Sequence, residues 1–292
     1  MRRITTYERF HRHMAAWVDR DIDCLLVLGR AGVGKSDAYQ AALGNRPHHR
    51  FGGRQSPLYV YQMLCDRPDI PVVLDDIAAL LRDNNFRDML KALCETGRRV
   101  IRWGTTTSKL EGRPQSFVCT APTLIVLNRI PPRDPDVAAV LDRCDAIEFA
   151  PSKAEVIQRM REIFPDDGDL IDLLAELPTT PSLRTLVKAR RWQKSRHLNL
   201  RQELLDECGV PEPVAHLAHI MQSTPRDKWL QRYMAETGLT DRTYRRHRPL
   251  AEQLLECCKS GDPCPNVRAD PPEAASNGRG ATTRGGDVVE EL

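Results

Sequence analysis

The chain of 292 residues has no long apolar run and no apolar stretch at its start. No run approaches the roughly 18 to 20 apolar residues that a membrane-spanning helix requires, so we expect no membrane segment. The opening residues, MRRITTYERF, lack the apolar core of a secretory signal, which favours a cytoplasmic location. Hydrophobic residues still make up 41% of the chain, enough to bury a core. At roughly 150 residues per domain, this length predicts two compact domains with a tail.

Paired cysteines and a large net charge are also missing. None of the nine cysteines has a partner at CxxC spacing, so the spacing supports neither a zinc site nor a disulfide scaffold, and we expect most thiols to be reduced and structural. The net charge of +3 is too small to indicate a partner. Residues 184–248 nevertheless contain 14 Lys or Arg against 7 Asp or Glu. Such a block suits either a polyanion or a solvated helical surface.

The first half of the chain alternates short apolar runs with helical patterns. One-sided apolar spacing predicts an entry helix over 4–19, with Ile4 on its apolar face. The apolar runs predict buried strands, and the segments between them predict helices. The strands are expected at 24–28, 71–74, 123–127 and 146–149, and the helices at 35–43, 57–66 and 84–96. Strands separated by helices predict an α/β fold with a mostly parallel sheet.

The second half of the chain is helical in pattern. Helices are expected at 153–163, 168–176, 181–196, 199–208, 212–222, 226–237 and 240–257. Residues 259–292 contain four Pro and five Gly with few large apolar groups, so we expect a disordered tail. The predicted segments are an N-terminal helix (1–20), an α/β core (21–150), a first helical segment (151–208), a C-terminal helical module (209–258) and the tail (259–292).

A phosphate-binding motif follows the first predicted strand. The segment reads GxxxxGKS and consists of Gly29, Arg30, Ala31, Gly32, Val33, Gly34, Lys35 and Ser36. Glycines let the backbone fold around phosphates, so that successive N–H groups and a helix N-terminus face them. Lys35 would reach the β and γ phosphates, and Ser36 would bind Mg²⁺. Because the motif lies between a strand and a helix, it predicts that the chain binds ATP or GTP.

Two acids follow the strand over 71–74. Asp75, at the strand end, is placed to hold Mg²⁺ through water, and Asp76 to orient or deprotonate an attacking water. By themselves, the two acids could equally cap the next helix. Beside a phosphate loop, the metal interpretation is favoured.

The order GRAGVGKS, VVLDDI, TLIVLN, LDRCDAIEF and PSLRTL resembles the AAA+ ATPases over roughly residues 21–195. The resemblance implies a P-loop NTPase core with an α-helical lid, here 151–208. It makes Asn128 the sensor 1 residue, which positions water against the γ-phosphate. It places Arg184 at the sensor 2 position, which contacts phosphate within the same chain, although three nearby cations compete for that role.

The segment LDRCDAIEF is similar to the SRC segment of clamp-loader subunits, whose arginine reaches the ATP of a neighbouring subunit. Arg143 would then complete the site of another copy, and the resemblance implies a homo-oligomer, either a ring or a spiral. The alternative is an ordinary surface arginine beside acidic neighbours. The family usually has Glu at the position of Asp76, and the shorter side chain of Asp is compatible with slow or partner-dependent turnover.

Two segments are candidates for touching DNA. A predicted hairpin of strands at 100–103 and 117–120 carries Lys109 and Arg113, which either contact phosphates or belong to a surface loop. Residues 229–255 resemble a helix-turn-helix, with Arg242, Arg245 and Arg246 facing outward. Many small helical bundles have the same spacing.

The sequence therefore predicts an ATPase that uses ATP and Mg²⁺ at subunit interfaces to load or remodel proteins on DNA, as replication or mobile-element helpers do. The alternative is a nucleotide-gated assembly switch that recruits a protein partner with little hydrolysis. A small-molecule kinase with the same loop is disfavoured, because Asp76, Asn128 and Arg143 occur in AAA+ order.

Overall fold

A computed structural model describes the chain except for residues 78–79, 105–109, 111, 130–134, 178 and 261–292. For residues 135–137 and 257–260 it describes the backbone alone. Lys109 and nearly all of the predicted tail therefore lie outside the described residues. Within the described part of the chain, every helix is too short or too polar to span a bilayer.

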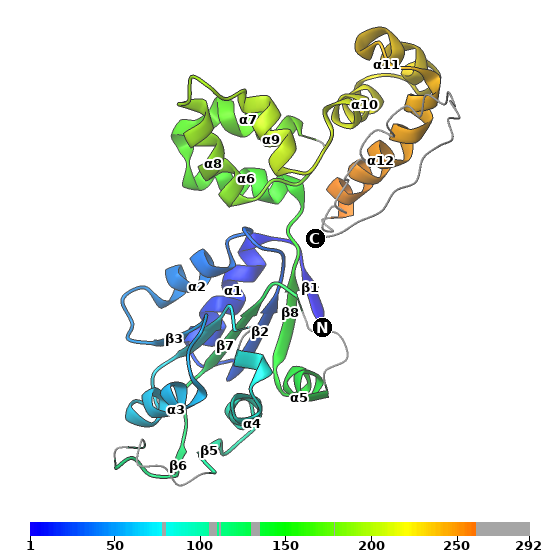
Figure 1. The fold of residues 1–292 in the computed structure, drawn as a ribbon. Coiled ribbons are helices and arrows are strands. Elements are labelled where there is room, and N and C mark those ends of the chain that lie inside the picture. Colours follow the sequence, from blue (N-terminus) through cyan, green and yellow to red (C-terminus); the bar gives the residue numbers. More distant parts are fainter. Residues whose placement is uncertain (78–79, 105–109, 111, 130–134, 178, 261–292) are drawn as a thin grey trace, which may run out of the picture.

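The core is a six-stranded sheet in which all neighbouring strands are parallel, in the order β1-β8-β2-β7-β4-β3 (Figure 1). The strands are β1 (Arg2–Ile4), β2 (Cys24–Leu28), β3 (His49–Phe51), β4 (Val72–Asp75), β7 (Thr123–Leu127) and β8 (Asp145–Phe149). The prediction of an α/β fold with a parallel sheet is confirmed. The central strands are continuous apolar runs because helices cover both faces of the sheet.

Helices on the two faces bury different residues of the same strands. The helices of this half are α1 (Tyr7–Val18), α2 (Lys35–Leu43), α3 (Pro57–Asp66), α4 (Asn84–Leu93) and α5 (Pro135–Arg143). Leu25 and Val27 pack with α1 and α2, whereas Cys24 and Leu26 pack with α3 and α4. This alternation follows from the two-residue side-chain period of a strand.

The N-terminal prediction was wrong at its first residues. Ile4 does not lie on the entry helix but ends β1, where it pairs with Phe149 of β8. A three-residue strand has too short a pattern to be recognised from sequence. The helix begins at Tyr7, because the Thr6 side chain accepts a hydrogen bond from the Arg9 amide as an N-cap.

A separate antiparallel pair lies near α3. It consists of β5 (Val100–Arg102) and β6 (Ser116–Val118), so the predicted hairpin is confirmed with shorter strands. The Tyr61 hydroxyl of α3 donates a hydrogen bond to the Pro114 carbonyl at 2.9 Å. The hairpin is thus held against α3 at the end where the connecting loop enters β6.

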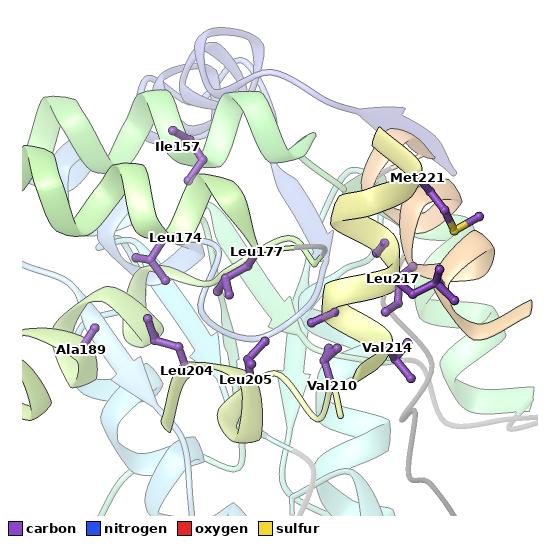
Figure 2. Packing of buried hydrophobic residues seen from close by; sticks show 14 of the residues in the cluster. Ile157, Leu174, Leu177, Ala189, Leu204, Leu205, Val210, Val214, Leu217 and Met221 are labelled. Atoms are coloured by element: carbon purple, nitrogen blue, oxygen red, sulfur yellow. The ribbon is translucent and has the colours of Figure 1, made fainter. Parts of the chain in front are cut away.

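The helical half begins where β8 ends. The helices are α6 (Lys153–Ile163), α7 (Gly168–Glu176), α8 (Leu183–Gln193), α9 (Leu200–Glu207), α10 (Glu212–Ser223), α11 (Trp229–Thr237) and α12 (Asp241–Ser260). Their buried residues form one cluster that runs from Val156 to Leu254. Figure 2 shows Leu204, Leu205, Val210 and Val214 succeeding one another from α9 to α10. The predicted boundary between 208 and 209 therefore falls inside a shared core.

Candidate functional site

The GxxxxGKS segment forms the loop between β2 and α2. Gly32 and Gly34 have φ values of 77° and 82°, a backbone conformation that residues other than glycine rarely adopt. A Cβ on Gly29 would lie 2.5 Å from the Phe149 carbonyl oxygen, and one on Gly32 would lie 2.8 Å from Ser182 Cβ. The glycines are therefore required both by the loop's curvature and by the close approach of β8 and the lid.

Lys35 is buried at the base of this loop, with 6% of its surface exposed. Its Nζ donates to the carbonyls of Gly29 and Arg30, at 2.6 and 2.8 Å, and to Asn128 Oδ1 at 2.9 Å. Burial lowers the pKa of Lys35 to about 8, an effect that Asp75 opposes and Arg184 adds to. The structure thus brings Lys35 and Asn128 into contact and places Arg184 in the same cleft.

Asp75 lies at the end of β4 and accepts several hydrogen bonds on one oxygen. Ser36 Oγ and the Tyr39 hydroxyl donate to its Oδ2 at 3.0 and 2.9 Å. Arg50 of β3 forms an ion pair with the same oxygen at 3.4 Å. The hydroxyl of Ser36 and the carboxylate of Asp75 are hard oxygen donors of the type that Mg²⁺ prefers, so this pair fits a magnesium ion.

Asp76 has a left-handed backbone, with φ of 60°. Its carbonyl accepts a hydrogen bond from the Gly53 amide at 3.1 Å, and its side chain is exposed in the cleft. Asp and Asn adopt this conformation more readily than longer side chains do, because their short polar groups can hydrogen-bond locally. This conformation gives a physical reason for Asp rather than Glu at the position.

The lid touches the phosphate loop directly. The Leu183 amide at the start of α8 donates to the Gly32 carbonyl at 2.8 Å, and Arg30 donates to the carbonyls of Thr180 and Pro181. Between the loop and the lid lies a cleft of about 840 Å³. Arg184 is exposed in this cleft, where no hydrogen bond or ion pair to the described residues holds its side chain.

Two further arginines line the cleft and were missed by sequence reasoning. Arg50 lies in a three-residue strand without an apolar run, and Arg159 is one of several cations on α6, so neither position has a spacing signal. The Arg159 guanidinium lies 5.7 Å from the centre of the Tyr7 ring, and the Tyr7 hydroxyl donates to the Val33 carbonyl at 3.0 Å. The cleft therefore combines cations with the glycine loop and with the acids Asp37, Asp75 and Asp76. This mixture suits a polyanion that is bound together with a metal ion.

The structure does not bring Arg143 to the cleft. It ends α5, two residues before β8 begins, whereas the phosphate loop follows the end of the parallel strand β2. Arg143 Nε forms an ion pair with Glu95 Oε2 at 3.2 Å, and its guanidinium also donates to the Ala139 carbonyl at 2.8 Å. Arg143 therefore lies at the opposite edge of the sheet from the cleft of its own chain.

The residues predicted to touch DNA differ in their surroundings. Arg113 forms a two-point ion pair with Asp66 of α3, at 2.7 and 2.8 Å, which favours an anchor between the hairpin and the core. Arg242, Arg245 and Arg246 are exposed on α12, as expected, and Arg245 pairs with Asp241. The turn before α12 contains Gly238 at φ 70°, and the two helices that flank it carry the buried residues Tyr233 and Tyr244, whose ring centres are 5.7 Å apart. Met234 of α11, by contrast, is 40% exposed.

Comparison with known proteins assigns no family to this arrangement: no protein-family model matches the chain, and no curated protein matches it either.

Proposed function

We propose that this chain is an AAA+ ATPase that binds ATP with Mg²⁺ in the cleft between its sheet and its lid. The observation that carries the proposal is the convergence of Lys35, Ser36, Asp75 and Asn128 from three strand ends. These strands, β2, β7 and β4, are neighbours in the sheet, so their carboxyl ends meet at one edge. Strand order, loop and lid are consistent with the P-loop architecture that the motifs predict.

In this proposal the loop binds the triphosphate through main-chain N–H groups and the ammonium group of Lys35. Lys35 exchanges the carbonyls that it now contacts for phosphate oxygens, which are stronger acceptors because they are charged. Ser36 and Asp75 hold the magnesium ion, which when bound supplies positive charge that neutralises and orients the phosphates. Arg184, and with it Arg159, provides positive charge from the lid side of the cleft.

Hydrolysis requires a water in line with the γ-phosphate. The Asp76 carboxylate would orient this water or act as the base that accepts its proton, and Asn128 would orient it from a neighbouring strand end. A guanidinium that stabilises the charge of the transition state comes from Arg143 of a neighbouring copy, since Arg143 of the same chain lies at the other edge of the sheet. The active unit is therefore a homo-oligomer, and the site is incomplete in one chain.

The binding step is tested by calorimetry with ATP and Mg²⁺. We expect the wild-type chain to bind with measurable heat and Lys35→Ala to bind at least about 100-fold more weakly. Lys188→Ala is the matched control, because this lid lysine pairs with Glu207 on the outside of the lid. Equal affinity in wild type and Lys35→Ala would refute the proposed loop.

The proposed task is loading or remodelling of proteins on DNA, with α11 and α12 as the contact to DNA. The supporting observation is the exposure of Arg242, Arg245 and Arg246 on one helix over a buried Tyr233–Tyr244 pair. Binding to duplex DNA should become less salt-dependent in an Arg245→Ala/Arg246→Ala variant, by a slope of about 0.9 for each lost phosphate contact. An unchanged slope would remove this module from the DNA contact.

A nucleotide-gated switch is the second candidate, favoured by one observation. Asp75 Oδ2 already accepts from Tyr39 and pairs with Arg50, so a magnesium ion must compete for it. Steady-state turnover separates the two candidates. A rate per chain that rises with protein concentration and with added DNA supports the ATPase, whereas a negligible rate under both conditions supports the switch.

A further inference from the structure

Three cysteines that are remote in sequence meet at the amino edge of the sheet. Cys24 is the first residue of β2, Cys94 caps the end of α4, and Cys144 links α5 to β8. Their three sulfurs lie within 4.8 Å of one another, and the Cys24 and Cys144 sulfurs are 3.0 Å apart. Cys24 and Cys94 are buried, and Cys144 is half-buried. We call this group the amino-edge thiol cluster.

The topology explains why the cluster forms. A helix that connects two parallel strands runs antiparallel to them, so its end lies where the strands begin. The ends of α4 and α5 therefore meet the start of β2, and each contributes one thiol. Since the three residues come from separate elements, their mutual approach depends on tertiary packing and not on local chain geometry.

The distances suit a metal ion with three thiolate ligands. Around Zn²⁺, with Zn–S bonds of about 2.3 Å, tetrahedral sulfurs are about 3.8 Å apart. Separations between 3.0 and 4.8 Å reach this value by small side-chain rotations. A disulfide would use two of the sulfurs and give no role to the third.

The surroundings also suit a thiolate centre. Three thiolates and one divalent cation have a net charge of −1, which needs compensation in a partly buried site. Arg99 and Arg143 bring positive charge to the sulfurs of Cys24 and Cys144, respectively, and each also pairs with a carboxylate, that of Asp23 or Glu95. Arg99 is 6% exposed, so its charge is only weakly screened by solvent. The partial exposure of Cys144 leaves an approach from solvent for a fourth ligand.

We propose that Cys24, Cys94 and Cys144 form a binding site for a thiophilic d¹⁰ metal ion of the Zn²⁺ type, with water as the fourth ligand. On binding, each thiol releases its proton to solvent and its sulfur forms a bond to the metal, with no change of oxidation state. Soft thiolate donors distinguish this site from the oxygen donors Ser36 and Asp75, which are at the other edge of the sheet.

The site also connects with Arg143, a consequence that rests on the proposed function. Arg143 and its ion-pair partner Glu95 are the sequence neighbours of Cys144 and Cys94. A metal bound to both cysteines fixes the two backbone segments that carry this ion pair. Metal occupancy thereby sets how readily Arg143 is released to a neighbouring copy.

Titration of the reduced full-length chain with Co²⁺ tests the site without nucleotide or turnover. We expect one equivalent to produce the near-ultraviolet thiolate-to-cobalt charge-transfer band and excess Zn²⁺ to remove it. The band should be lost in Cys24→Ser, Cys94→Ser and Cys144→Ser. It should persist in Cys65→Ser, on α3, and in a variant with Ser at the C-terminal cysteines Cys257, Cys258 and Cys264. No band, or a band that survives Cys94→Ser, would overturn the proposal.

Because substitutions in a buried cluster can impair folding, the wild-type chain supplies a second measurement. Zn²⁺ at 100-fold excess over its Kd should raise the melting temperature by roughly 5 °C and protect the three thiols from alkylation. Equal alkylation with and without Zn²⁺ would refute the site. So would a Cys24–Cys144 disulfide with free Cys94 in chain purified without reductant. Loss of ATP binding with retained cobalt binding would refute the proposed function alone.

Discussion

The carboxyl edge of the central sheet concentrates its polar groups on one continuous loop and two strand ends, whereas the amino edge assembles its thiols from three separate elements. Both edges are ends of the same strand, since β2 begins with Cys24 and leads into Gly29. The carboxyl edge uses main-chain groups held in place by glycines with positive φ. At the amino edge, the chemistry belongs to side chains that tertiary packing places together. The two edges should therefore fail in different ways when they are mutated.

The largest expected effect is that of Lys35→Ala, which should act at the carboxyl edge and leave the amino edge unchanged. Lys35→Ala should abolish ATP turnover, because no other described side chain donates to Gly29, Arg30 and Asn128 at the base of the loop. The same variant should retain cobalt binding at the amino edge, since the two sites share no ligand. Parallel calorimetry and cobalt absorption measure both in one preparation. Loss of both activities together would indicate global unfolding and break the proposed independence of the edges.

The second-largest effect concerns Arg143, which lies at the amino edge of its own chain and is proposed to act at the carboxyl edge of a neighbouring copy. Arg143→Ala should retain ATP affinity but lower turnover by at least about 10³-fold, the lower end of the effect that an arginine supplied in trans has in NTPases. Asp76→Asn should be inactive for a different reason. It removes the carboxylate, whereas Asn tolerates the positive φ of this position as Asp does. Each inactive chain retains what the other lacks.

Mixing the two variants should therefore restore part of the activity. At an interface where Asp76→Asn contributes Arg143 and Arg143→Ala contributes Asp76, all groups are present. The measurement is turnover of the mixture against each variant at the same total concentration. Activity no higher than the mean of the separate variants would contradict the trans role and leave Arg143 as a surface arginine paired with Glu95.

The third effect compares two glycines with similar backbone angles. Gly32, at the carboxyl edge, has φ of 77°, and Gly97, which follows α4, has φ of 87°. A Cβ on Gly97 meets nothing within 4 Å, whereas one on Gly32 meets Ser182 at 2.8 Å. Gly97→Ala should lower the free energy of unfolding by about 1–2 kcal/mol through backbone strain alone. Gly32→Ala should cost about 1–3 kcal/mol more, because it also displaces the lid.

Urea unfolding of both variants measures the difference. Equal costs would mean that the lid moves away from the loop without penalty, and the contact between Leu183 and Gly32 would then carry little stability. A larger cost for Gly32→Ala would show that loop and lid are mechanically coupled before nucleotide binds.

The features that the sequence predicts correctly are those encoded in contiguous residues, as at the carboxyl edge. The strand Thr123–Leu127 and the helix Lys35–Leu43 matched the structure to the residue, since an uninterrupted apolar run defines the strand and Gly34 and Gly44 flank the helix. The loop between β2 and α2 was also predicted, because the residues that form it, 29–36, are contiguous in the sequence. Strand β1, with only three residues, and Arg50 on the equally short β3 were missed.

The thiol cluster could not have been predicted, and the reason is physical. The cysteines of the chain have no CxxC spacing, so the sequence alone indicates no metal site. Cys24 and Cys144 are 120 positions apart and approach only because α5 returns the chain to the start of β2. The same return placed Arg143 at the amino edge, which motif order alone did not reveal. Long-range side-chain groups require the topology, whereas loop motifs do not.

The smallest expected effect concerns the ion pair that ties Arg143 to its own chain. Arg143 Nε and Glu95 Oε2 are 3.2 Å apart, and 32% of the arginine side chain is exposed. Partly exposed pairs of this type contribute about 0.2–1 kcal/mol, so Glu95→Gln should release Arg143 and raise turnover at limiting protein concentration by up to about fivefold. Asp142→Asn is the matched control, because it removes a neighbouring negative charge that, among the described residues, forms no hydrogen bond or ion pair with Arg143. A rise in both variants would assign the effect to net charge, whereas a fall in Glu95→Gln would mean that the pair holds Arg143 in its working position and that the amino edge is preorganised for the neighbour.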